Sequence, residues 1–146
     1  MKIAIGADHA GYMLKEEIKK YLDSKNIEYI DYGTYSLDSI DYPDYALPVA
    51  KAVANGECTQ GILVCYTGIG MSMCANKVKG IRGALVGSVE NAILTREHNN
   101  ANVLCLGAKD TMSDVAFKIV DAFINTKFTH GRHERRVNKV MCIENE

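Results

Sequence analysis

Short apolar runs alternate along the chain with longer segments in which apolar residues recur at every third or fourth position. The short runs are typical of buried strands, and the periodic segments are typical of amphipathic helices. The expected strands are residues 2–6, 28–32, 61–65, 82–86 and 103–107. Because strands and helices alternate from end to end, the pattern predicts an α/β fold with a parallel sheet flanked by helices.

Three helices are expected from the spacing of apolar residues. The apolar positions that share one face of the first are Leu14, Ile18, Tyr21 and Leu22. The lysines and glutamates between them are expected to face water. Ser88 is a suitable N-cap for a second helix that continues to about Glu97. The face of the third helix is formed by Val115, Ala116, Ile119, Val120 and Phe123.

Two stretches depart from this alternation. Residues 33–44 are polar and rich in turn formers, which predicts a loop over a ligand site. Pro43 and Pro48 predict that any helix before Ala54 starts late or is kinked. Residues 127–146 are first basic and then partly apolar, which predicts a C-terminal helical arm. Its basic residues either face solvent or bind an anion.

Composition favours a single domain that acts on a small molecule. At 146 residues and 47% hydrophobic content, residues 1–146 are expected to form one domain. The net charge of −1, with both signs interspersed, argues against nucleic acid or an anionic membrane as a partner. The apolar stretches are too short for a signal peptide or a membrane span, so a cytoplasmic protein is expected.

Cys65 is the first candidate for chemistry. It opens Cys65-Tyr66-Thr67-Gly68-Ile69-Gly70, which reads as the end of a strand, a glycine-rich turn and the start of a helix. Unpaired N–H groups at such a helix start stabilise a thiolate or an oxyanion. The alternative is that Cys65 is a small buried hydrophobic residue. The other cysteines lack CxxC or metal-site spacing and are expected to be reduced packing residues: Cys58, Cys74, Cys105 and Cys142.

Polar side chains follow two of the expected strands. Asp8 and His9 come after the first strand, and Cys65 and Thr67 come at the end of the third. In open parallel sheets, ligands bind at the carboxyl ends of the strands. These four side chains are therefore expected to meet at one edge of the sheet.

Five sequence motifs, in order along nearly the whole chain, carry a resemblance to a known family. They are Gly6-Ala7-Asp8-His9-Ala10-Gly11, Asp41-Tyr42-Pro43, Cys65 through Gly70 with Ala75-Asn76-Lys77, Arg96-Glu97-His98-Asn99 with Ala101-Asn102-Val103, and Gly131-Arg132-His133 with Arg136. With these motifs the chain resembles the ribose-5-phosphate isomerase B enzymes, which are related to the galactose-6-phosphate isomerase subunits.

The resemblance implies a Rossmann-like three-layer α/β/α domain with a five-stranded parallel sheet, assembled as a homodimer or a dimer of dimers. It also implies isomerisation of ribose 5-phosphate and ribulose 5-phosphate through an enediolate, without metal or cofactor. By resemblance, Cys65 is the base, and Thr67 with the amides of Gly68 and Gly70 supports the enediolate. The resemblance implies that Asp8 and His98 open the sugar ring. It implies that His9, Arg132 and Arg136 bind the phosphate, and that Tyr42 and Asn99 line the sugar site.

The expected topology separates these residues within one chain. The helix at 89–97 must run antiparallel to its strand, which carries His98 and Asn99 some 13 Å back toward the opposite sheet edge at about 1.5 Å per residue. His98 is therefore not expected to reach Cys65 of the same chain. We expect a site shared between two subunits related by a two-fold axis, with His98, Asn99 and both arginines supplied across the interface.

Two positions depart from the family pattern, and two alternatives remain. Tyr66 stands where the family usually has glycine, and its ring either displaces the turn amides or reshapes the sugar pocket. Lys109 stands where many members have arginine. The substrate could instead be a hexose phosphate, such as allose or galactose 6-phosphate. The chain could also be a non-catalytic flavodoxin-like or receiver-like module, although a receiver would carry an acidic cluster where Asp8 is followed by histidine.

Overall fold

One parallel sheet of five strands organises the molecule, in the order β2-β1-β3-β5-β4. A computed structural model describes residues 1–146. The strands are β1 (Lys2–Ala7), β2 (Glu28–Asp31), β3 (Gln60–Cys65), β4 (Gly83–Leu85) and β5 (Val103–Gly107). The three central strands are almost wholly buried, whereas the edge strands β2 and β4 are partly exposed. The five predicted strands and their parallel arrangement are confirmed.

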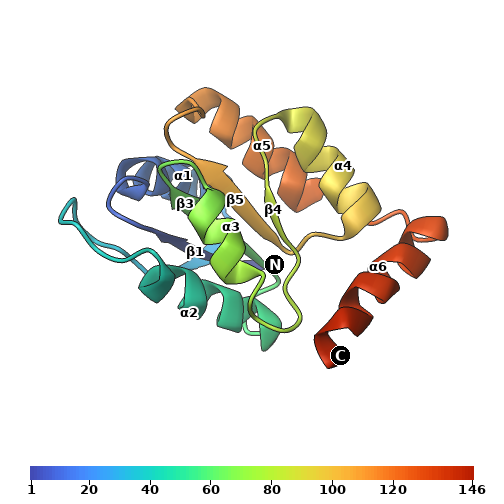
Figure 1. Cartoon of the computed structure of the whole chain (residues 1–146). Helices are drawn as coiled ribbons and strands as arrows, with labels where there is room; N and C mark the ends of the chain where they lie inside the picture. The colour runs from blue at the N-terminus through green and yellow to red at the C-terminus, as the bar shows by residue number, and fades with distance from the viewer.

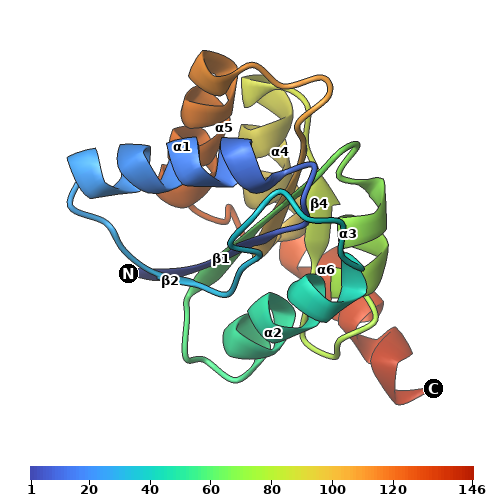
Figure 2. The same ribbon diagram turned by 90° about the vertical axis from the view of Figure 1, so that its left-hand side faces the viewer.

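Helices cover both faces of the sheet (Figures 1 and 2). They are α1 (Tyr12–Ser24), α2 (Pro43–Ala54), α3 (Ile69–Ala75), α4 (Val89–Asn99), α5 (Ser113–Asn125) and α6 (Arg132–Cys142), followed by a short 3₁₀ turn at Ile143–Asn145. Successive strand residues point to opposite faces, so two separate cores form. One lies under α1, α4 and α5, and the other under α2 and α3. The predicted three-layer α/β/α architecture is confirmed.

Helix α2 corrects the expectation of a late start. It begins at Pro43, the first of the two prolines, and runs through Pro48 to Ala54. A proline in the first helical turn lacks only an N–H that would have no helical partner. The helix buries an apolar face against the sheet, which favours the helical conformation across Pro48.

Helix α1 confirms the predicted apolar face but corrects one polar position. Leu14, Ile18 and Leu22 are buried in the core. Lys15 was expected to face water and is instead 0% exposed. Its ammonium group is buried because it pairs with Asp31 at the end of β2, a partner far from it in sequence.

The C-terminal segment forms the expected helical arm. The backbone N–H and the hydroxyl of Thr129 both donate to the carbonyl oxygen of Glu97, at 3.2 and 2.8 Å, which ties the arm to the end of α4. Helix α6 then lies at the side of the molecule, beside that end (Figure 1). Only Val137 of α6 is buried, and Val140 is 56% exposed. No helix of the chain is both long and apolar enough to cross a bilayer.

Candidate active site

The Cys65 sulfur lies in a tight turn between β3 and α3. Cys65 is 5% exposed, and the backbone N–H of Gly68 donates to its Sγ at 3.1 Å. Gly68 has a φ of +79°, and a Cβ there would come within 2.8 Å of the backbone carbon of Leu106. The glycine is therefore needed both for the backbone conformation and for the close packing. It places one amide directly against the sulfur.

That amide gives Cys65 an environment that the neighbouring thiols lack. Burial raises the pKa of the Cys105 thiol and that of Cys74, and the nearby Cys65 raises each further. All five cysteines are free, and Cys105 has no exposed surface. Cys105 and Cys74 are consequently protonated at neutral pH and unsuited to act as a base.

Asp8 and His9 lie beside this turn, at the end of β1. The N–H of Asp8 donates to the carbonyl oxygen of Val64 at 3.2 Å, which ties Asp8 to the carboxyl end of β3. Its Oδ1 accepts from the N–H of Gly11 at 2.9 Å. Nδ1 of His9 accepts from the N–H of Ile40 at 3.2 Å. This bond leaves Nε2 to carry the ring proton, so His9 can donate through Nε2 to a ligand.

The aromatic and glycine candidates complete this edge of the sheet. The ring of Tyr42, 39% exposed, packs so closely on Gly70 that a Cβ there would lie 2.8 Å from it. The Thr67 hydroxyl accepts from the N–H of Ile69 at 3.3 Å. Tyr66 is 57% exposed, and its φ is not positive, so the tyrosine fits the turn without left-handed backbone. The N–H of Lys109 donates to the carbonyl oxygen of Tyr66 at 2.9 Å.

Eight of the twelve candidate residues thus lie at the carboxyl edge of the sheet, and four do not. Those at this edge are Asp8, His9, Tyr42, Cys65, Tyr66, Thr67, Gly68 and Gly70. His98, Asn99 and Arg136 line a different cavity of about 550 Å³, and Arg132 begins the helix beside it. This cavity is bounded by residues at or near the amino ends of β4 and β5, such as Gly83 and Ala101. A strand rises about 3.3 Å per residue, so the two groups are separated by roughly the length of β3.

Within this cavity, His133 is a residue whose role sequence reasoning missed. Its ring stacks on that of His98, with centroids 4.3 Å apart and an interplanar angle of 8°. Partial burial lowers the pKa of His133, and the nearby His98, Arg132 and Arg136 lower it further. The signal was its spacing, because a residue three before Arg136 lies on the same face of a helix. The cavity is therefore lined by two histidines and by two arginines, Arg82 and Arg136.

No group of three or more His, Cys, Asp or Glu side chains converges in an arrangement that could hold an ion.

Comparisons with known proteins agree with the motifs. The profile of the ribose/galactose isomerase family matches residues 3–140, which include all twelve candidate residues. Ribose-5-phosphate isomerase B of Escherichia coli (strain K12) is 46% identical over 143 residues, covering 98% of this chain and 96% of that protein.

Solved structures give the same result. The structure of Clostridium thermocellum ribose-5-phosphate isomerase B aligns with a TM-score of 0.98 at 49% identity and covers 99% of this chain and 98% of its own. The Mycoplasma genitalium ribose-5-phosphate isomerase B, solved with bound ribulose-5-phosphate, aligns with a TM-score of 0.95 at 44% identity, over 99% and 97% of the two chains.

Proposed function

This chain belongs to the ribose/galactose isomerase family, and we propose that it interconverts ribose 5-phosphate and ribulose 5-phosphate through an enediolate, with Cys65 as the base. It is an aldose–ketose isomerase of the ribose-5-phosphate isomerase B type, so a non-catalytic flavodoxin-like or receiver-like role is set aside. The observation that carries the mechanism is the hydrogen bond from the Gly68 amide to the Cys65 sulfur, 3.1 Å long and formed between two buried residues of the turn.

The chemistry needs a base beside C2 of the open-chain sugar and support for one developing negative charge. The Cys65 thiolate removes the C2 proton, and the C–H electron pair forms the C1–C2 double bond while the carbonyl oxygen becomes negative. Return of a proton to C1, with loss of the proton from O2, gives the ketose. One hydrogen moves from C2 to C1 and one from O2 to O1, so the reaction needs no outside oxidant or reductant.

During this reaction the Cys65 turn can serve two negative charges, that of the sulfur and that of the enediolate oxygen. Before proton transfer, the Gly68 amide donates to the Cys65 sulfur. As the sulfur becomes neutral, the Thr67 hydroxyl and the amides of Gly68 and Gly70 are available to the enediolate oxygen. Preorganised donors of this kind are usually the largest electrostatic contribution to such a reaction.

The remaining steps require groups from both parts of the molecule. In our proposal Asp8 and His98 open the sugar ring, and Tyr42 and Asn99 line the sugar. His9, Arg132 and Arg136 bind the phosphate. The two arginines begin α6 at positions four apart on one helical face, so both guanidinium groups can donate to the same anion.

We propose that the active site is assembled from two chains, in a homodimer or a dimer of dimers. Two-fold symmetry would bring His98, Asn99, Arg132 and Arg136 of one subunit to Cys65 of the other. The separation of these groups within one chain supports this arrangement. So does the exposed apolar surface of the arm, where Val140 is 56% exposed.

Two broader assignments accompany this function. We assign the activity to one domain of residues 1–146, with residues 127–146 as its C-terminal arm. Five free cysteines suit a reducing compartment, so we propose a cytoplasmic location.

A hexose phosphate is the second candidate substrate, because of Tyr66. The ring of Tyr66 follows Cys65 directly and is 57% exposed at the edge where the sugar would bind. It can therefore change which sugar chain length fits. Turnover of ribose 5-phosphate, allose 6-phosphate and galactose 6-phosphate under the same conditions, by wild type and by Tyr66→Gly, separates the two substrates.

Isotope exchange tests the proposed mechanism. The purified protein is incubated with ribose 5-phosphate in D₂O containing a chelator, and the ribulose 5-phosphate formed is analysed by NMR. A base that exchanges its proton with solvent introduces deuterium at C1. Deuterium at C1 would support the enediolate route, turnover that the chelator abolishes would contradict a metal-independent reaction, and no turnover of ribose 5-phosphate would contradict the substrate.

A further inference from the structure

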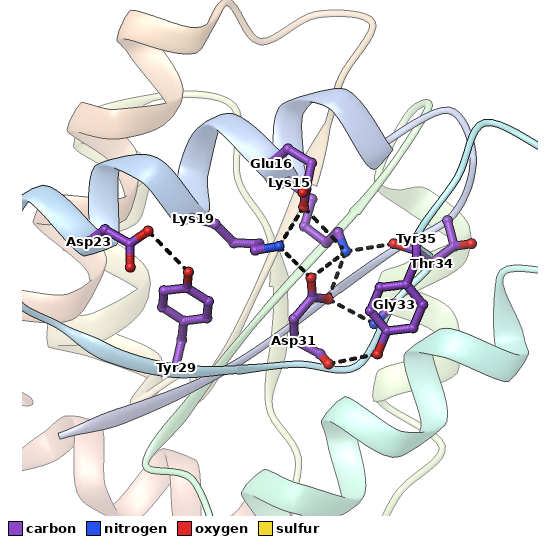
Figure 3. Close-up of polar contacts among 9 residues, drawn as sticks. All are labelled: Lys15, Glu16, Lys19, Asp23, Tyr29, Asp31, Gly33, Thr34 and Tyr35. Atoms are coloured by element: carbon purple, nitrogen blue, oxygen red, sulfur yellow. Dashed lines mark hydrogen bonds and ion pairs between the residues drawn. The ribbon is translucent and has the colours of Figure 1, made fainter.

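Lys15 is a charged group buried where lysine is rarely found. It is 0% exposed, and all three of its N–H donors have acceptors. The ammonium nitrogen lies 2.7 and 2.8 Å from the two carboxylate oxygens of Asp31 and 2.6 Å from the carbonyl oxygen of Thr34 (Figure 3). The rings of Tyr12 and Tyr35 lie within 5.5 Å of it. Lys15 therefore joins α1 to the end of β2 and to the segment that follows.

Asp31 holds the same segment from the other side. Its Oδ1 accepts from the N–H of Gly33 at 2.8 Å, and its carbonyl oxygen accepts from the Tyr35 hydroxyl at 2.9 Å (Figure 3). Lys19 adds a second ion pair to Asp31 at 2.8 Å. Residues 33–35 are thus fixed by side-chain contacts to both members of the Lys15–Asp31 pair.

This anchored segment leads directly into the active site. The N–H of Ala7 donates to the carbonyl oxygen of Gly33 at 2.6 Å. The N–H of Thr34 donates to the carbonyl oxygen of Ala7 at 2.7 Å. Ala7 immediately precedes Asp8 and His9. Further along the same segment, the N–H of Ile40 donates to Nδ1 of His9, and Tyr42 packs on Gly70 of the Cys65 turn.

We propose that Lys15 is a positioning residue of the isomerase site: paired with Asp31, it anchors residues 33–42 so that Ile40 orients the His9 ring and Tyr42 stays against the Cys65 turn. The proposal rests on the proposed function. None of the hydrogen bonds of Lys15 goes to a candidate substrate-binding residue. A buried ion pair commonly adds little stability over apolar packing, so its benefit here lies in geometry.

Replacement of Lys15 by methionine tests this role. Lys15→Met removes the ammonium group, which leaves the Thr34 carbonyl without its donor. Hydrogen exchange at the Ile40 amide should become about tenfold faster, while exchange at Leu104 in the central strand β5 stays unchanged. The KM for ribose 5-phosphate should rise about tenfold, because His9 and Tyr42 are displaced while Cys65 is intact.

Lys19→Met is the matched control. It removes another donor to Asp31 from the same helix, but Lys19 does not reach Thr34. Ile40 exchange and KM should both stay within about twofold of wild type. A purely structural loss in Lys15→Met would lower the active fraction, and so the apparent kcat, and would leave KM unchanged.

A second variant covers the case in which Lys15→Met fails to fold. Tyr35 is 67% exposed, so Tyr35→Ala removes its ring and hydroxyl from the cluster without opening the core. Ile40 exchange should again become faster, by about threefold. Unchanged Ile40 exchange in folded Lys15→Met, or in Tyr35→Ala if only that variant folds, overturns the proposal. Hydrogen exchange is measured without substrate, so it tests the role of Lys15 independently of activity. If the wild-type protein does not turn over ribose 5-phosphate, the proposed function is refuted by that result alone.

Discussion

At the residue scale, Cys65 differs from the other cysteines in what its sulfur contacts. Cys58 and Cys105 are as deeply buried as Cys65, but only Cys65 has a backbone donor directed at its Sγ. The motif of a cysteine, a polar residue and glycines predicted this turn. The exact partner, the amide of Gly68, depends on a left-handed backbone that only the folded turn shows.

The first residue-scale prediction concerns proton transfer. Cys65→Ala should lower kcat/KM for ribose 5-phosphate by about 100-fold or more, because the base is lost. Its unfolding midpoint should stay close to that of wild type. Cys105→Ala, the matched control in the same core, should keep the activity and lose about 1 kcal/mol of unfolding free energy. Equal activity of the two variants would reject Cys65 as the base.

The second residue-scale prediction compares two glycines with nearly the same φ. Gly68 and Gly56 have φ values of +79° and +77°, but a Cβ at Gly56 would meet nothing within 4 Å. Gly56→Ala should cost about 1 kcal/mol of unfolding free energy in backbone strain alone. Gly68→Ala should cost about 1–3 kcal/mol more, because the Cβ meets the Leu106 backbone, and should also lower kcat. Urea unfolding and initial rates measure both, and equal stability losses would contradict the packing argument.

At the scale of elements, hydrophobic periodicity predicted the helices that are buried on one face and the strands that are buried on both faces. The predicted strands and the apolar faces of α1 and α5 are those of the structure. Proline positions were a weaker guide, since α2 begins at Pro43 and continues through Pro48. The burial of Lys15 could not be read from its helix, because its main partner Asp31 lies on a different element.

The link between α1 and β2 gives a pH prediction. Burial alone raises the pKa of the Asp31 carboxyl, but hydrogen bonds from Lys15, Lys19 and the Gly33 amide outweigh it and hold the pKa below its usual value of 3.8. A lowered folded-state pKa means that this stabilisation is complete above the unfolded-state pKa and is lost as the pH falls through the folded-state pKa.

Asp31→Asn measures that contribution. At pH 7 the variant should lose about 3 kcal/mol of unfolding free energy, because the Lys15 charge is left without its carboxylate. The difference in unfolding free energy between variant and wild type should become smaller below about pH 4, because the unfolded wild type takes up a proton at Asp31. Urea unfolding at several pH values tests this, and a gap that widens on acidification would contradict the assigned direction.

At the scale of the whole molecule, the helices carry site residues to both edges of the sheet. Helix α4 runs back to the amino edge, and α6 packs beside its end (Figure 1). His98 and His133 stack there, and both residues line the cavity of about 550 Å³. The two groups of candidate residues are thus separated by about the height of the sheet, and the proposed second chain would bring them together.

Mixing two variants, each altered in a different part of the proposed site, tests whether the site is shared. In a heterodimer of Cys65→Ala and Arg136→Ala, one site receives both substitutions and the other receives neither. Random mixing after co-refolding should restore about a quarter of wild-type activity, since half of the dimers are mixed and each has one intact site. Each variant refolded alone is the control. A mixture with no more activity than its components would place Cys65 and Arg136 in the same chain's site.

The sequence by itself determined the strands, the helical faces and the Cys65 turn, because alternation of apolar residues and the conformational freedom of glycine act over a few neighbouring positions. The separation of His98 from Cys65 within a chain already followed from the topology expected from the sequence, whereas the tertiary structure alone decided the partners of Lys15 and His133. Those contacts join residues far apart along the chain. They depend on how helices are placed around the sheet, which local periodicity does not encode.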